Sequence, residues 1–117
     1  MKVGMGDSAP SFSMDSVNKG HIELSWYSGS NLVLVFGRYF GCPVCQDDFD
    51  QLLAMSVKTE VPIIYFTQSL EGSARKYLEG YDVDFPVIPV PNKNGYQIYK
   101  DFGVGMMGFN TMLSILR

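Results

Sequence analysis

The amino-acid sequence predicts a single α/β domain in which helices flank a central mixed β-sheet. Two continuous apolar runs, at residues 32–36 and 61–67, have the character of strands that are covered on both faces. Segments with helical patterning alternate with these runs, which favours a largely parallel sheet. The chain has 117 residues and 46% of them are hydrophobic, which suits one domain, residues 1–117, with a single core.

An irregular lead-in is followed by a predicted β-hairpin. Its turn is Asn18-Lys19-Gly20, where glycine supplies the positive φ that the turn needs. Alternating apolar residues at Ile22, Leu24 and Trp26 predict the second strand. The two strands are expected at residues 12–16 and 21–26.

After this hairpin, strands and helices are expected to alternate. A helix over 69–81 would place Ala74, Tyr77, Leu78 and Tyr81 on one face. The strand after it contains two prolines, which predicts an edge position in the sheet. The expected elements are strands at 32–36, 61–67, 85–90 and 111–116 and helices at 43–57, 69–81 and 94–102.

The chain contains two cysteines, Cys42 and Cys45, which form a C-x-x-C pair shortly after the 32–36 strand. At a strand-to-helix turn in an α/β pattern, such a pair is typical of a thioredoxin-like redox site. Pro43 suits the first position of the helix, where its missing N–H costs no hydrogen bond. A helix N-terminus carries a partial positive charge that favours a thiolate, so both cysteines are predicted to be catalytic.

The helical register assigns different roles to the two cysteines. Cys42, as the N-cap, would lie at the helix tip and be the nucleophile, whereas Cys45 would point into the core and resolve the mixed disulfide. Arg38, at the end of the preceding strand, is expected to add positive charge near the site, while Asp47 and Asp48 oppose thiolate formation. The apolar stripe that Cys45 continues consists of Phe49, Leu52, Leu53 and Ser56.

Two other interpretations of the cysteines stay open. A structural zinc site needs four ligands, and two cysteines with the single histidine, His21, do not supply them within one chain. A four-cysteine site shared across a dimer would supply them, and an inert cysteine pair is the other alternative. His21 is expected on the hairpin surface, and no metal or other cofactor is predicted.

The charge and hydropathy of the chain bear on its partners. The net charge is −3 and there is no basic run, so charge gives no support for nucleic-acid binding. The first residues lack the apolar segment of a signal peptide, and no apolar stretch reaches the length of a membrane span. We therefore expect a cytoplasmic protein with no membrane partner, where a C-x-x-C pair is more often catalytic or metal-binding than structural.

Several segments occur in the order found in one known family. The first reads Gly6-Asp7-Ser8-Ala9-Pro10-x-Phe12, and the others are 33–45, 74–78, 85–88 and 99–104, with the cysteine motif as the most specific part. Together they resemble the AhpC/TSA-type, peroxiredoxin-like branch of the thioredoxin-like superfamily that carries a C-x-x-C motif. The resemblance implies a thioredoxin-like fold and antioxidant thiol chemistry.

The chain also departs from peroxiredoxins proper, in which the peroxide-reacting cysteine ends the motif P-x-x-x-T-x-x-C. That register places Cys45 at the reacting position, Cys42 at the threonine position and Arg38 at the proline position. The arginine that would polarise the peroxide falls near Asn110 and is missing there. A proline that faces the disulfide, as in thioredoxins, is also missing, because no proline occurs from Asn92 onwards.

The predicted function is a thiol–disulfide oxidoreductase that acts on a protein or small-molecule disulfide and is recycled by a thiol reductant. The first alternative is a thiol-dependent peroxidase, in which Cys45 reacts with the peroxide and Cys42 captures the sulfenic acid. The second alternative is a non-enzymatic redox-sensing or dimerising module whose disulfide only changes its shape.

The last predicted strand begins at Thr111 and reaches Leu116, one residue before the chain ends at Arg117. The family resemblance implies a further strand and helix after it, so the C-terminus is expected to be shortened. An open apolar edge at this strand would invite pairing with a second copy, and we predict a homodimer through it.

Overall fold

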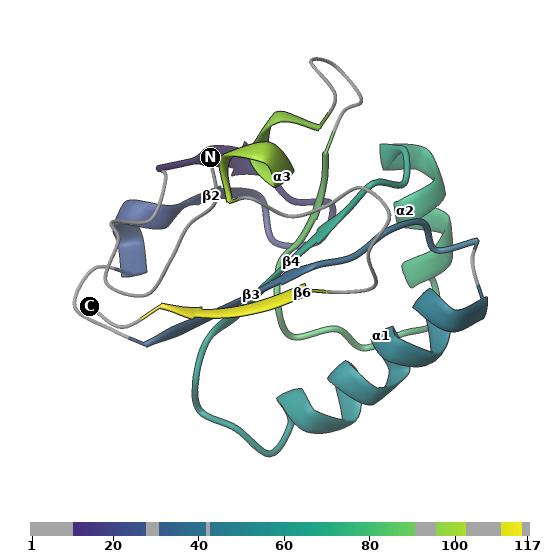
Figure 1. Ribbon diagram of the computed structural model, residues 1–117. Helices are drawn as coiled ribbons and strands as arrows, with labels where there is room; N and C mark the ends of the chain where they lie inside the picture. The colour runs from purple at the N-terminus through teal and green to yellow at the C-terminus, as the bar shows by residue number, and fades with distance from the viewer. Residues whose placement is uncertain (1–10, 28–30, 42, 91–95, 103–110, 116–117) are drawn as a thin grey trace.

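The computed structural model describes residues 11–27, 31–41, 43–90, 96–102 and 111–115 (Figure 1). For residues 44, 45 and 111–115 it describes the backbone alone. In chain order the elements are β1 (Ser13–Asp15), β2 (His21–Glu23), the 3-10 helix η1 (Leu24–Tyr27), β3 (Leu32–Phe36), α1 (Pro43–Ser56), β4 (Ile63–Thr67), α2 (Glu71–Leu78), β5 (Val87–Pro89), α3 (Gln97–Asp101) and β6 (Thr111–Ile115). The predicted α/β order is confirmed.

The central sheet has the strand order β5-β4-β3-β6. Strands β3, β4 and β5 run parallel, and β6 runs antiparallel to β3, so the sheet is mixed, as predicted. Leu34 in β3 pairs with Ile64 on one side and with Leu113 on the other. The edge position predicted for the proline-containing strand is confirmed, because β5 ends one side of this sheet.

Each face of the sheet is covered by a different set of elements, because successive side chains of a strand point to opposite faces. One face packs against the β1–β2 hairpin and α3, and the other packs against α1 and α2 (Figure 1). Buried residues on the hairpin face include Leu34, Phe36, Ile64, Phe66 and Tyr99. Those on the other face include Val35, Phe49, Tyr65, Ala74 and Val87.

Helix α1 presents the predicted apolar stripe to the sheet. Phe49, Leu52 and Ser56 are buried, and Leu53 packs against the same cluster. This spacing of three and four residues is what brings side chains onto one face of a helix. No helix in the described part of the chain is both long and apolar enough to cross a membrane.

Two predicted elements end well before the bounds expected from the sequence, whereas the ends of the others differ by about one residue. The strand expected over 21–26 stops at Glu23, and the chain turns into η1, which leaves Trp26 58% exposed. The alternating apolar residues therefore predict the strand correctly only as far as Glu23. The helix expected over 69–81 spans Glu71–Leu78, so Tyr81 lies outside it, although its ring still stacks on that of Tyr77 at 5.3 Å between centroids.

The hairpin has the expected turn, with Gly20 at a φ of 75°. Its turn residues also reach the central sheet. The Nδ2 group of Asn18 donates to the carbonyl of Phe85 at 2.8 Å, and its Oδ1 accepts from the N–H of Val87 at 2.9 Å. The N–H of Val17 donates to the carbonyl of Val87 at 2.9 Å. The hairpin turn therefore covers the outer side of β5.

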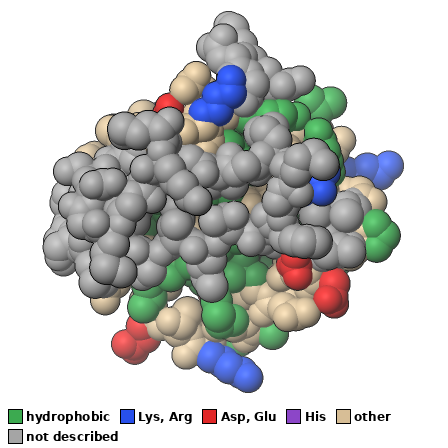
Figure 2. Space-filling view, in the orientation of Figure 1, with side chains coloured by type: hydrophobic (Ala, Val, Ile, Leu, Met, Phe, Trp, Pro, Cys, Tyr) green, Lys and Arg blue, Asp and Glu red, His purple; other side chains and the backbone are tan. Residues whose placement is uncertain are grey.

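The surface position predicted for His21 is confirmed. Its Nδ1 lies 2.8 Å from Oδ1 of Asp15, and its Nε2 lies 2.8 Å from the hydroxyl of Ser13. Charged side chains of both signs are scattered over the described surface shown in Figure 2, without one continuous patch of either sign.

Candidate active site

The connection from β3 to α1 carries the cysteine motif, and its first residue is fixed by the core. The N–H of Gly37 donates to the carbonyl of Phe66 at 2.7 Å, and the hydroxyl of Tyr99 donates to the carbonyl of Gly37. A Cβ atom at this position would overlap with the hydroxyl group of Tyr65. The backbone that leads into the site is therefore held from β4, from α3 and by close packing.

Arg38 lies at the end of β3, as predicted. Its carbonyl accepts from the N–H of Gln68 at 3.0 Å and from the hydroxyl of Thr67 at 2.7 Å. The side chain is half-buried, and its Nε is buried without a hydrogen-bond partner among the described residues. A buried guanidinium nitrogen retains positive charge, since arginine stays protonated in proteins.

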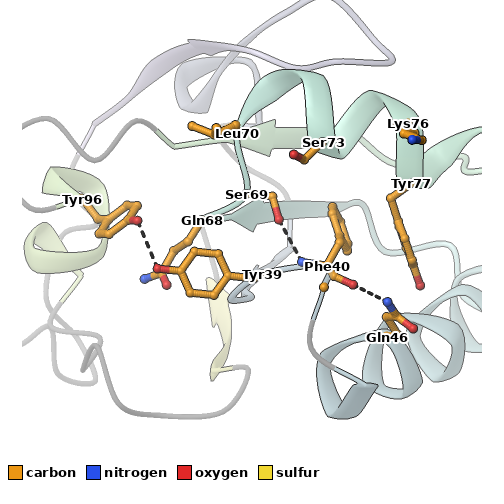
Figure 3. A pocket seen from close by; sticks show the side chains of 11 residues that line it. Tyr39, Phe40, Gln46, Gln68, Ser69, Leu70, Ser73, Lys76, Tyr77 and Tyr96 are labelled. Carbon is orange, nitrogen blue, oxygen red and sulfur yellow. Dashed lines mark hydrogen bonds between the residues drawn. The ribbon is translucent and has the colours of Figure 1, made fainter.

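Phe40 is fixed on both sides by hydrogen bonds. Its N–H donates to the hydroxyl of Ser69 at 2.8 Å, and its carbonyl accepts from the side-chain amide of Gln46 (Figure 3). Gln46 belongs to the first turns of α1 and Ser69 precedes α2. These two bonds join the turn before the cysteines to both helices of this face.

Pro43 begins α1, which confirms the predicted start of the helix at the cysteine motif. Cys45 is the third residue of α1 and precedes the buried Phe49 by four residues. Cys42, predicted as the N-cap, lies outside the described residues, as does the side chain of Cys45. Their predicted roles therefore stay predictions, while the backbone around them has the expected strand-turn-helix form.

A cleft of about 640 Å³ opens beside the turn that leads to Cys42 (Figure 3). One wall is formed by residues 39–41 of the turn, and the other is formed by the connection from β4 to α2 and by α2 itself. Sequence reasoning did not find this cleft, because its walls come from segments about thirty residues apart. The residues that line it are Tyr39, Phe40, Gly41, Gln46, Gln68, Ser69, Leu70, Ser73, Lys76, Tyr77 and Tyr96.

Two tyrosines meet at one end of the cleft. The hydroxyl groups of Tyr39 and Tyr96 are 3.4 Å apart (Figure 3). The hydrogen bond with Tyr39, together with burial, raises the pKa of Tyr96 above its ordinary value. Tyr96 also has a φ of 60°, in the left-handed region that bulky side chains rarely adopt. Such strained backbone conformations cluster at functional sites, and this one occurs at a residue that lines the cleft.

The opposite end of the cleft is closed by Tyr77. Its ring stacks on that of Phe40 at 4.4 Å between centroids. Burial is the main cause that raises the pKa of its phenol, and the neighbouring Tyr81 side chain adds to the shift. The rings of Phe40 and Tyr77 therefore form an uncharged aromatic wall at this end of the cleft.

The structure brings some predicted site residues together and leaves others apart. Arg38 and Pro43 lie at the two ends of the turn that holds Cys42. His21 lies on the hairpin, which packs on the other face of the sheet from α1. Within the described ranges, no group of three or more His, Cys, Asp and Glu side chains could hold a metal ion. The zinc alternative depends on the two cysteine side chains and stays untested.

Comparison with known proteins gives a family match over most of the chain. The model of the AhpC/TSA family matches residues 5–109. A search of curated protein sequences found no match.

Similar solved structures share the fold over nearly the whole chain. A Chlorobium tepidum protein assigned as thiol:disulfide interchange protein DsbE is 25% identical, with a TM-score of 0.74 and coverage of 97% of this chain and 79% of that one. The thioredoxin domain of a Bacteroides vulgatus thiol-disulfide oxidoreductase is 14% identical, with a TM-score of 0.78 and coverage of 98% and 83%. A secreted Mycobacterium tuberculosis disulfide oxidoreductase is 16% identical, with a TM-score of 0.67 and coverage of 87% and 81%. The predicted thioredoxin-like fold is thereby confirmed.

Proposed function

Because the chain belongs to the AhpC/TSA family, we propose that it is a thiol–disulfide oxidoreductase with Cys42 and Cys45 as its redox pair. The observation that carries the proposal is the start of α1 at Pro43, between the two cysteines. The N–H groups at the first turn of a helix have no intrahelical partner, and the helix dipole places partial positive charge there. Both effects favour the thiolate, which is the reactive form of cysteine.

The proposed reaction has two steps. The Cys42 thiolate attacks one sulfur of the substrate disulfide, a mixed disulfide forms, and the first substrate thiolate leaves and takes up a proton. The Cys45 thiolate then attacks the Cys42 sulfur and releases the second substrate thiolate. The substrate gains two electrons, the protein ends as an intrachain disulfide, and a thiol reductant restores it.

Two neighbouring residues have supporting roles in this proposal. Pro43 starts α1 without leaving an N–H unpaired, which keeps the helix N-terminus directed at the motif. Arg38 brings a positive charge, and its Nε atom has no hydrogen-bond partner among the described residues. A cation near a thiol lowers its pKa, so Arg38 would raise the fraction of thiolate.

The similar structures are consistent with the proposal. The Chlorobium tepidum protein, which shares 25% of its aligned residues with this chain, is assigned as a thiol:disulfide interchange protein. The cytoplasmic location expected from the sequence remains a proposal, and fractionation of native cells tests it.

A thiol-dependent peroxidase is the second candidate, and the family match itself favours it. In that reaction the Cys45 thiolate attacks the peroxide, the alcohol or water leaves, and a sulfenic acid forms on Cys45. Cys42 then condenses with the sulfenic acid, water leaves, and the same disulfide results. The two mechanisms assign opposite nucleophiles, so single cysteine variants separate them.

The test uses the Cys42→Ser and Cys45→Ser variants, with intact mass as the readout. We expect Cys45→Ser to accumulate a mixed disulfide with a small disulfide and Cys42→Ser to remain unmodified. Rapid formation of a sulfenic acid in Cys42→Ser with stoichiometric peroxide would instead support the peroxidase. Reduction of insulin disulfides and consumption of peroxide, measured on one wild-type preparation with a recycling dithiol, give the matching comparison of activity.

The same assay addresses the non-enzymatic alternative. A redox-sensing module would form the Cys42–Cys45 disulfide reversibly and turn over neither substrate. Two free thiols that persist after mild oxidation would contradict every redox interpretation of the motif.

A further inference from the structure

We propose that the cleft beside Gly41 binds low-molecular-weight disulfides that carry a carboxylate, and that Lys76 selects for this negative charge. The inference rests on the proposed function, since it names the substrate class of the same site. It concerns a cleft lined by eleven described residues, of which Lys76 is the charged one.

The size and place of the cleft suit a small molecule. Its volume of about 640 Å³ falls within the ~300–1,000 Å³ that small-molecule sites typically have. Gly41, which lines the cleft, is joined directly to Cys42 in the chain. A molecule held between this turn and α2 is therefore held next to the motif.

The charge of the lining favours an anion. Apart from Lys76, the described lining residues are apolar or are neutral hydrogen-bonding groups, with no carboxylate among them. Lys76 is exposed and makes no ion pair with any described residue. The neighbouring Arg75 differs, because its Nε lies 3.6 Å from Glu71 and its Nη1 donates to the carbonyl of Val17 at 3.1 Å. Lys76 is thus the cation on α2 whose charge is available to a ligand.

Neutral polar groups lie close to this charge. Ser73 precedes Lys76 by three residues on α2, and both line the cleft (Figure 3). The Ser73 hydroxyl can donate to a carboxylate oxygen that the lysine attracts. The aliphatic chains of the ligand would pack against the apolar lining of the cleft. This lining includes the ring of Tyr39, which is 45% exposed, and the side chain of Leu70, which is 75% exposed.

The reaction in the cleft balances without a further reagent when the protein starts in its reduced form. One disulfide molecule is consumed, two thiols are released, and one Cys42–Cys45 disulfide forms. A single-turnover experiment with pre-reduced protein therefore measures the substrate preference directly, with no recycling reductant in the mixture.

The test compares three disulfides of similar length and different charge: 3,3′-dithiodipropionate, bis(2-hydroxyethyl) disulfide and cystamine. We expect the dianion to react about fivefold faster than the neutral disulfide, the effect of one charge pair near 4 Å in water, and the dication to react slowest. Lys76→Glu should reverse this order, and 1 M salt should reduce it in the wild type. Lys58→Glu, outside the cleft, makes the same change in net charge and should leave the wild-type ratio intact.

Equal rate ratios in the wild type and in Lys76→Glu would overturn the inference while leaving the proposed function in place. Failure of all three disulfides to react, together with failure to reduce insulin, would overturn the proposed function. Whenever the three disulfides do not react, binding decides the inference. For that measurement, 3,3′-dithiodipropionate is titrated into the unreactive Cys42→Ser/Cys45→Ser variant and followed by amide chemical shifts. Shifts at Gly41, Ser73 and Lys76 support the cleft, and their absence at millimolar ligand contradicts it.

Discussion

The hydroxyl group of Tyr65, in the middle of β4, occupies the space that a Cβ atom of Gly37 would take at the end of β3. The two residues are far apart in the sequence but meet because their strands run parallel and side by side. Glycine is needed at position 37 because of this close approach, and the approach fixes the backbone that leads to the cysteine motif.

Replacing Gly37 with alanine is expected to lower the free energy of unfolding by about 1–3 kcal/mol, the usual cost of overpacking a core. The Tyr65 ring is fully buried and cannot swing away into solvent. Urea unfolding followed by circular dichroism measures the change as a lower midpoint with an unchanged m value.

Gly72→Ala provides the matched control for this substitution. A Cβ atom at Gly72 meets nothing within 4 Å, and the residue lies in α2. Alanine in a helix is more favourable than glycine by up to about 1 kcal/mol, so this variant should be neutral or more stable. Equal destabilisation by both substitutions would show that the Tyr65 contact is not the cause.

The Tyr99→Phe variant tests the bond that joins α3 to the same turn. Tyr99 is buried, and its hydroxyl donates to the carbonyl of Gly37. Loss of one buried hydrogen bond should cost about 0.5–1.5 kcal/mol. Tyr39→Phe removes a longer, 3.4 Å bond from a half-exposed ring, and we expect it to change stability by less than about 0.5 kcal/mol. The comparison is made by thermal unfolding of both variants, and a larger loss in Tyr39→Phe would contradict it.

These contacts between distant segments are the features of the fold that the sequence did not predict. Apolar periodicity and the positions of glycine and proline reveal local structure, so the order of elements, the start of α1 at Pro43 and the turn at Gly20 were predicted correctly. The bonds that shape the site join distant segments through side chains, as Ser69 does with Phe40 and Tyr99 with Gly37. No local pattern encodes such pairs, so the cleft and its lysine were not predicted.

Tyr77 provides a prediction about pH. Burial raises the pKa of its phenol above the ordinary value of 10.0, at which the unfolded chain would ionise. The folded protein therefore holds more protons than the unfolded chain above about pH 10, and stability must fall as the pH rises from there. Tyr77→Phe should weaken this alkaline fall, as measured by unfolding midpoints between pH 8 and 11. At pH 7, where the phenol is protonated in both the folded and the unfolded chain, the same variant should show none of this pH dependence.

A variant of the hairpin turn tests the role of Gly20. Gly20 has a φ of 75°. Replacing it with alanine should lower the free energy of unfolding by about 1–2 kcal/mol, the penalty of an L-residue in the left-handed region. Asparagine tolerates this conformation better, so Gly20→Asn should lose less stability than Gly20→Ala. Equal losses in the two variants, measured by denaturant unfolding, would exclude backbone conformation as the cause.

Homodimerisation through β6 remains a prediction. This strand ends one side of the sheet in the described part of the chain, and an edge strand presents N–H and C=O groups with which a second chain can pair. We expect light scattering to give a dimer mass at high protein concentration, with hydrogen exchange of β6 amides slowing as the concentration rises. A monodisperse monomer at all concentrations would contradict the prediction.

The hairpin turn is expected to limit the number of copies that could join through the edges of the sheet. Asn18 and Val17 use both outward backbone groups of Val87, so the β5 side of the sheet offers no free pairing site at that residue. Two copies that met through β6 would form one continuous sheet with a β5 strand at each outer border, covered at Val87 by the hairpin turn. A third copy would not find at Val87 the open edge that β6 presents, so we expect a complex formed through β6 to close with two-fold symmetry instead of growing into a fibre.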